Sequence, residues 1–175
     1  MNTELNVVRT RQHLDCDAGR AWEKVCFYEH IELQPGWLLR TALPVPQRTT
    51  GAYRRAGDIS SCQYSDGGHL TKRIREIREG RVDFDVIQQT IRYAGRIDLK
   101  GGCIEITPEQ GGCLVEMVTY YDLRAGWLRP LRRAIDYVVG RMHRIVLADM
   151  RARLAPGIAP GNRQHARLAT YTNLR

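Results

Sequence analysis

Residues 130–154 read PLRRAIDYVVGRMHRIVLADMRARL and decide the fold class. When this stretch is projected at 100° per residue, its apolar side chains form one stripe and arginines occupy the opposite side. The stripe contains Leu131, Ile135, Val138, Met142, Ile145 and Val146, and the opposite side contains Arg133, Arg144 and Arg151. Pro130 suits the first turn of a helix, and Pro156 with Gly157 ends it. At 1.5 Å per residue the helix is about 37 Å long, which is enough to cross a whole β-sheet.

Asp149 is the residue of this helix that apolar packing does not explain. The projection places it inside the stripe, in line with Leu131 and Met142. A buried carboxylate must be paired or protonated. Asp149 therefore reaches the rim of the core, pairs with Arg153 or with an arginine on a strand, or acts as a catalytic or ligand-binding group. His143 at the border of the stripe is a weaker candidate for an acid or base, and so is His69 near a predicted turn.

The central part of the sequence alternates in the manner of β-strands. The strand-like segments are LNVVRTRQHL (5–14), GDISSCQY (57–64), HLTKRIREI (69–77), VDFDVIQQT (82–90), GCIEIT (102–107) and CLVEMVTYYDL (113–123). Glycine pairs at 67–68, 101–102 and 111–112 are interpreted as hairpin turns, because such turns need positive φ angles. Since the segments follow one another directly, an antiparallel meander is predicted.

Alternation also assigns side chains to the two faces of this sheet. One face is predicted to carry Val8, Thr10, Gln12 and Leu14 in the first strand, Val82, Phe84, Val86 and Gln88 in the fourth, and Val115, Met117, Thr119 and Tyr121 in the last. The hairpin around 67–68 leaves two registers open. The first pairs Tyr64 with His69 and Cys62 with Thr71; the second pairs Tyr64 with Leu70 and Ser60 with Ile74. We prefer the second, because it gathers more apolar side chains on one face.

Two short helices are expected between the first strand and the meander. The sequence DAGRAWEKVCFYEHI (17–31) has apolar residues at steps of three and four, and Asp15 or Asp17 is suited to cap its N-terminus. WLLRTAL (37–43) is expected to form the second helix, stopped by the prolines at 44 and 46. Residues 47–57 are expected to form a polar loop.

The composition favours one globular domain. The chain has 175 residues, of which 43% are hydrophobic and 26% charged, close to globular averages. No segment approaches the roughly 20 apolar residues that span a bilayer, and the N-terminus does not resemble a signal peptide, so a cytoplasmic protein is expected. The five cysteines, at 16, 26, 62, 103 and 113, include no C-x-x-C pair. Reduced thiols and no metal site are therefore expected, although Cys103 and Cys113 are candidates to face each other across a hairpin.

The net charge of +8 comes almost entirely from arginine. A basic surface attracts acidic proteins or anionic lipid. Nucleic acid is not expected, because no run of five basic residues is interleaved with aromatic ones. No phosphate-binding loop, dinucleotide fingerprint or nucleophile elbow occurs in the sequence, so no cofactor is expected.

The order of elements resembles that of the START-like, or SRPBCC, superfamily, which has the α+β helix-grip fold. The resemblance covers about residues 5–154. The motifs that carry it are HLDCDAGRAWEKV (13–25), GGHLTKRI (67–74) and GGCIEITPEQGGCLVEMVTYY (101–121). It implies a curved antiparallel sheet wrapped around the long C-terminal helix, with two short helices after the first strand. It further implies a ligand-binding domain over residues 1–155 and a flexible tail over 156–175.

The resemblance also implies a cavity between the terminal helix and the concave face of the sheet. Its expected lining is Tyr64, Phe84, Val86, Gln88, Val115, Met117, Thr119, Tyr121, Val138, Met142 and Ile145. The leading functional hypothesis is binding of a hydrophobic or amphipathic small molecule, such as a lipid, polyketide or isoprenoid. The alternative is a polyketide cyclase or dehydratase that acts on a substrate held by an acidic carrier protein, with Tyr64, Tyr121 and Asp149 as candidate catalytic groups. An anionic membrane surface is a further expected partner, and a regulatory module without a small ligand is a third class.

Overall fold

The long C-terminal helix is present in a computed structural model of the protein, which describes residues 5–26, 44, 46–51, 54–124 and 126–154. The helix α3 spans Arg132–Leu154, and the 3-10 turn η1, Gly126–Leu131, precedes it and contains Pro130. The helix therefore begins two residues later than the sequence predicts. The second short helix expected at 37–43 and the tail at 156–175 lie outside the described residues.

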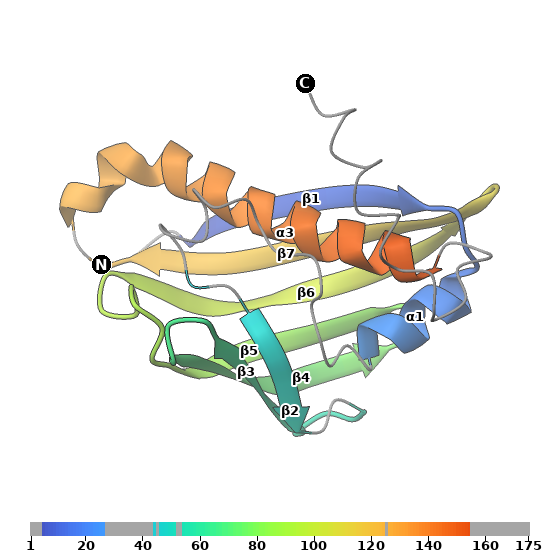
Figure 1. Cartoon of the computed structure of the whole chain (residues 1–175), viewed down its shortest axis with the longest axis horizontal. Coiled ribbons are helices and arrows are strands. Elements are labelled where there is room, and N and C mark those ends of the chain that lie inside the picture. The colour runs from blue at the N-terminus through green and yellow to red at the C-terminus, as the bar shows by residue number, and fades with distance from the viewer. Residues whose placement is uncertain (1–4, 27–43, 45, 52–53, 125, 155–175) are drawn as a thin grey trace.

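The remaining elements form one seven-stranded antiparallel sheet and a short helix (Figure 1). The elements are β1 Asn6–Leu14, α1 Ala18–Cys26, β2 Pro46–Gly51, β3 Ile59–Tyr64, β4 His69–Arg78, β5 Arg81–Gln89, β6 Ile97–Glu109 and β7 Gly112–Leu123. The strand order is β1-β7-β6-β5-β4-β3-β2, so β2 to β7 are a meander and β1 joins its far edge. The predicted α+β helix-grip arrangement is confirmed.

The start of α1 and the position of β2 can be compared with the sequence predictions. The carboxylate of Asp17 accepts hydrogen bonds from the backbone N–H groups of Gly19 (2.8 Å) and Arg20 (3.4 Å), which confirms Asp17 as the cap. The prediction of a polar loop from residue 47 is wrong over β2. These polar residues form an edge strand because the backbone of β3 supplies the partners, which side-chain composition does not reveal.

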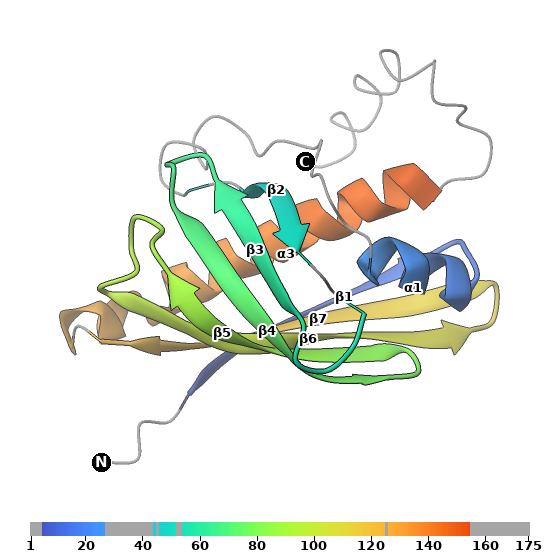
Figure 2. The ribbon, with the colours of Figure 1, turned by 90° about the horizontal axis from the view of Figure 1, so that it is seen from below.

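The sheet is strongly curved, and the glycine pair Gly101–Gly102 lies inside β6 where the curvature requires it. Figure 2 shows β2, β3 and β4 turned up beside α3 while β7 and β6 pass beneath it. A Cβ atom on Gly101 would lie 2.3 Å from the carbonyl oxygen of Phe84, and one on Gly102 would lie 2.2 Å from that of Val118. The prediction that this pair forms a hairpin turn is therefore wrong. The glycines permit close approach of neighbouring backbones at an irregularity in the β6–β7 pairing.

Neither predicted register of the β3–β4 hairpin is correct. Cys62 pairs with Leu70, and Ser60 therefore faces Lys72. The cause is the turn, in which the carboxylate of Asp66 accepts hydrogen bonds from the backbone N–H groups of Gly68 (3.0 Å) and Arg92 (2.7 Å). Alternation of apolar residues carries no information about such a side-chain contact.

Cys103 and Cys113 do not face each other. Cys103 pairs with Val118 across β6–β7, whereas Cys113 pairs with Pro108 near the turn. Both side chains are buried free thiols. Burial and the neighbouring Cys16 raise the pKa of Cys113 to about 12, so this thiol is protonated at neutral pH.

The apolar core is divided into two clusters that hold the two ends of the terminal helix. The larger cluster contains Leu14, Cys16, Ala21, Ile74, Val82, Ile106, Cys113, Val115, Leu147, Met150 and Leu154. The smaller contains Val8, Tyr121, Leu123 and Leu128, with Ile135 and Val139 packed against it. Two side chains in the middle of α3, Val138 and Met142, belong to neither cluster. The helix thus bridges the sheet between two anchoring points.

A polar contact beneath the middle of α3 joins the helix to two strands. The imidazole of His143 is hydrogen-bonded to the hydroxyl of Thr119 on β7 (2.8 Å) and to that of Thr10 on β1 (3.1 Å). Burial and, secondarily, the charge of Arg144 lower the pKa of His143 to about 4. The imidazole is therefore neutral at physiological pH.

We predict a pH dependence of stability that originates at His143. In the unfolded chain a histidine titrates near pH 6.5, whereas the folded protein resists protonation of His143 until about pH 4. As the pH falls through this window only the unfolded state gains the proton, so stability is lost. Urea unfolding should show a loss of about 2 kcal/mol between pH 7.0 and 4.5 that is absent from the variant His143→Asn. The exposed His13 gives the control His13→Asn, which should behave as the wild type. An equal loss in wild type and His143→Asn would contradict this assignment.

Candidate functional site

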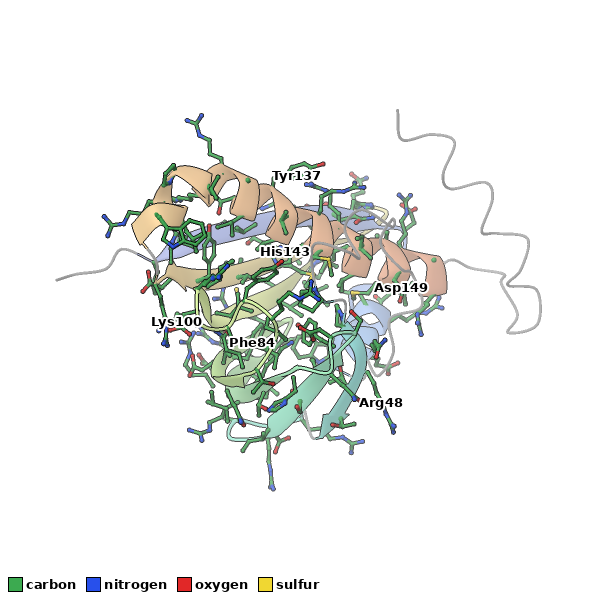
Figure 3. The ribbon with its side chains drawn as sticks, turned by 60° about the vertical axis from the view of Figure 1, so that its left-hand side comes forward. Arg48, Phe84, Lys100, Tyr137, His143 and Asp149 are labelled. Atoms are coloured by element: carbon green, nitrogen blue, oxygen red, sulfur yellow. The ribbon has the colours of Figure 1, made fainter. Side chains whose placement is uncertain are left out.

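A cavity of about 930 Å³ lies between the concave face of the sheet and the middle of α3. The sheet contributes apolar side chains that include Leu70, Phe84, Val86, Ile104 and Met117. The helix contributes Val138, Val139, Met142, Val146 and Met150. Figure 3 shows Phe84 on the sheet side of this space and His143 beneath the helix, with Tyr137 on the outer side of the helix. The volume and the mainly apolar wall are typical of a site for a small molecule.

Most of the side chains expected to line a cavity lie on this wall. They are Tyr64, Phe84, Val86, Met117, Thr119, Val138 and Met142. These residues come from three strands and the helix, and curvature of the sheet brings them to one space. Burial raises the pKa of the Tyr64 phenol above its ordinary value, so Tyr64 is a neutral hydrogen-bonding group at the wall.

Four residues of the expected lining lie elsewhere, and the first two are Gln88 and Val115. Gln88 is exposed, because Ile87 is an extra residue in β5 that shifts the alternation of the strand beyond Val86. Val115 is fully buried within the larger core cluster. Val115 packs between the sheet and the C-terminal end of α3, in the same cluster as Leu147 and Met150. Close packing there leaves no cavity surface.

The other two expected lining residues that lie outside the cavity wall are Tyr121 and Ile145. Tyr121 is fully buried in the smaller core cluster, and its hydroxyl donates a hydrogen bond to Asp136 at 2.5 Å. Burial and this carboxylate raise the pKa of Tyr121. Ile145 is half-buried outside the cavity wall, because the buried side of α3 is centred on His143 and Leu147 rather than on the stripe read from the sequence.

Asp149 is 2% exposed and lies outside the cavity wall. Its carboxylate accepts a hydrogen bond from Nε of Arg153 at 2.8 Å, one helical turn later. The pairing with Arg153 that the spacing suggests is therefore present. A catalytic role for Asp149 stays a prediction that its position in the structure does not favour.

The structure adds polar residues that the sequence interpretation did not assign to the cavity. Ser60, Lys72 and His143 lie on its wall, and so does Arg96, whose guanidinium stacks on Trp127 at 5.7 Å. The sequence did indicate an inward position for Lys72, because this residue alternates with Leu70 and Ile74 on β4. That signal is easily overlooked, because a lysine in an alternating strand is ordinarily placed on the solvent side.

The wall of the cavity carries positive charge and no negative charge among the described residues. Its charged members are Arg48, Arg54, Lys72 and Arg96, and no aspartate or glutamate from the described part of the chain lines it. Arg48 and Arg54 are exposed, whereas Lys72 is half-buried. The electrostatic environment of the cavity therefore favours an anionic or polarised oxygen over a cation.

The described residues include neither a metal site nor a membrane-spanning helix. Within these ranges, no three histidine, cysteine, aspartate or glutamate side chains are grouped so that they could hold a metal ion. Nor does any described helix combine the length and the apolar character needed to cross a membrane.

Comparison with known proteins identifies the fold. No protein-family model matches the sequence, and no curated protein matches it either. Solved structures do match. The Zhui aromatase/cyclase from Streptomyces sp. R1128 has a TM-score of 0.62 at 10% identity, with 86% of this chain and 94% of that chain covered. Ginseng major latex-like protein 151 from Panax ginseng has a TM-score of 0.60 at 15% identity, with 87% and 99% covered.

A START superfamily protein from Mycobacterium smegmatis has a TM-score of 0.60 at 11% identity, with 85% of this chain and 96% of that chain covered. These similarities extend over nearly the whole length of each matched structure, and the identities are too low to transfer a ligand or an activity. The chain therefore has the helix-grip fold of START-like proteins.

Proposed function

We propose that this protein binds a hydrophobic or amphipathic small molecule in the cavity beneath α3 and so transports or sequesters it. The observation that carries the proposal is the 930 Å³ space lined mainly by aliphatic, aromatic and methionine side chains between two packed core clusters. A core of this size is ordinarily filled to the density of an organic crystal. Unfilled space of this extent supports a role in ligand binding.

The chemistry of the wall supports the same proposal. Met117 on the sheet and Met142 on the helix both line the cavity, and methionine adapts to ligands of different shape. Tyr64, Thr119 and His143 supply a small number of polar groups among the apolar ones. This combination binds an apolar body and orients a few polar atoms.

The proposal predicts that filling the cavity will abolish binding. N-Phenyl-1-naphthylamine, a neutral fluorescent dye, should bind the wild-type protein with a stoichiometry of one. Val138→Trp places an indole in the space beneath α3 and should weaken dye binding by about tenfold or more, because the volume is occupied. Fluorescence titration measures both values.

The matched control is Val7→Trp, which makes the same exchange at an exposed position of β1. This variant should bind the dye as the wild type does. The proposal would be overturned if the wild type failed to bind the dye, or if Val138→Trp bound it with unchanged affinity while remaining folded by circular dichroism. Native mass spectrometry of the purified protein would identify any ligand retained from the cell.

A second candidate is an enzyme of the polyketide cyclase or dehydratase type. One observation favours it: the neutral imidazole of His143, hydrogen-bonded to Thr119, lies on the cavity wall with the phenol of Tyr64. A positioned imidazole can accept or return a proton as a flexible polyketone folds. The arginines on the exposed side of α3 suit an acidic carrier protein that would deliver such a chain, and this association should weaken as salt is raised.

Turnover of a linear poly-β-ketone thioester tests this candidate. If it is correct, the protein accelerates ring closure, and His143→Ala lowers turnover by about 10²-fold or more while dye affinity changes by less than about threefold. Mass spectrometry of the cyclised products provides the measurement. Ring closure at the uncatalysed rate in the presence of wild-type protein would eliminate the candidate.

A further inference from the structure

We propose that the cavity contains an anion-binding subsite, formed by Lys72 and Ser60, that takes the carboxylate of an amphipathic monocarboxylic acid. The apolar body of this ligand would occupy the space toward Val138 and Met142 on α3. The inference rests on the proposed binding function and names the class of ligand for the same site.

Ser60 and Lys72 are brought together by the observed register of β3 and β4. They are directly opposed residues of adjacent antiparallel strands, so their side chains leave the same face of the sheet with Cβ atoms about 5 Å apart. Both side chains line the cavity. The hydroxyl and the flexible ammonium group can therefore both turn toward the carboxylate of one ligand.

Ser60 has an unmet hydrogen-bonding capacity. The residue is 2% exposed, and its Oγ has no hydrogen-bond partner within the described part of the chain. It is the one buried side-chain oxygen or nitrogen atom in that part for which this holds. A buried hydroxyl without a partner is costly, and a ligand oxygen at this point would accept a hydrogen bond from it.

Lys72 is held over the cavity, and its ammonium group has no counter-ion among the residues that the structure describes. Its Nζ lies 4.8 Å from the centre of the Phe84 ring, a cation–π contact that keeps the ammonium group on the cavity side of the sheet. The carboxylates of the described residues form no ion pair with it, and none of them lines the cavity. A ligand anion would supply the missing negative charge.

On the outer face of the same strands, basic side chains with acidic partners provide a contrast. There, Arg75 and Arg81 both contact Asp83, at 3.4 and 2.8 Å, and Arg81 also contacts Glu105 at 2.9 Å. Lys100, elsewhere in the sheet, is paired with Asp98 at 2.6 Å. These three basic side chains are paired with carboxylates, whereas no carboxylate from the described part of the chain pairs with Lys72 in the cavity.

The single positive charge of the subsite, on Lys72, favours a carboxylate ligand over a phosphate. The subsite offers one ammonium group and one hydroxyl, which match a single negative charge shared by two oxygen atoms. A phosphate monoester carries more charge and more acceptor atoms, and its usual recognition uses clustered arginines or backbone N–H groups. Arg96 is engaged with Trp127, and Arg48 lies at an exposed position.

Matched twelve-carbon ligands test the subsite. Dodecanoate and dodecanol share the apolar chain and differ in the charged group, and their affinities can be measured by displacement of N-phenyl-1-naphthylamine at pH 7.5. We expect the wild type to prefer dodecanoate by about tenfold or more, and Lys72→Met to abolish that preference while dodecanol affinity changes by less than about threefold. Ser60→Ala should weaken dodecanoate binding by about fivefold.

Arg73→Met is the control, because it removes one positive charge from the neighbouring, exposed position of β4. This variant should keep the wild-type preference. If the wild type binds both ligands equally, or if folded Lys72→Met or its alternative Lys72→Gln still prefers dodecanoate, the subsite is overturned while the proposed function stands. If the wild type binds neither ligand nor the dye, both proposals are overturned.

Discussion

The attachment of α3 to two separate apolar clusters is the constraint on which the rest of this structure depends. Leu147 and Met150 hold one end of the helix against the larger cluster, and Leu128 in the preceding turn holds the other end in the smaller one. Between these two ends, His143 is hydrogen-bonded to Thr119 and Thr10, which also ties the middle of the helix to the strands. The middle of α3, between the two clusters, can therefore border a cavity while the ends of the helix hold the fold together.

Curvature of the sheet creates the cavity beneath the middle of α3. The absence of side chains at Gly101 and Gly102 lets β6 approach the carbonyl groups of its neighbours, and β2 to β4 then rise beside the helix. Side chains that point inward from these strands line a concave surface. Charged residues are distributed differently between this surface and the outer face of the sheet. Acidic residues such as Asp83 are paired with arginine on the outer face, whereas Lys72 is left on the inner one. The same backbone geometry thus sets both the volume of the cavity and its electrostatic preference.

Much of the architecture could be predicted from hydrophobic periodicity. The alternation in β1 placed Val8 and Leu14 toward the core, and the 3.6-residue period identified the terminal helix. Errors arose where one extra residue or a small rotation changed which side chains face inward. The bulge at Ile87 turned Gln88 outward, and the rotation of α3 replaced Ile145 with His143 on the wall. Periodicity has no means of locating such irregularities, because they depend on contacts with residues distant in the sequence.

The sequence by itself determined the class of fold, because the order of strands and the long amphipathic helix leave few ways to bury their apolar faces. It also determined that Asp149 and Arg153 lie one helical turn apart and can pair. Tertiary structure alone decided that Val115 and Tyr121 fill solid core while Met117 and Thr119 border open space. It also decided that Ser60 faces Lys72. The physical reason is that alternation fixes the side of a strand on which a residue lies, whereas distance to the helix and pairing across strands are set by the turn at Asp66 and the curvature of the whole sheet.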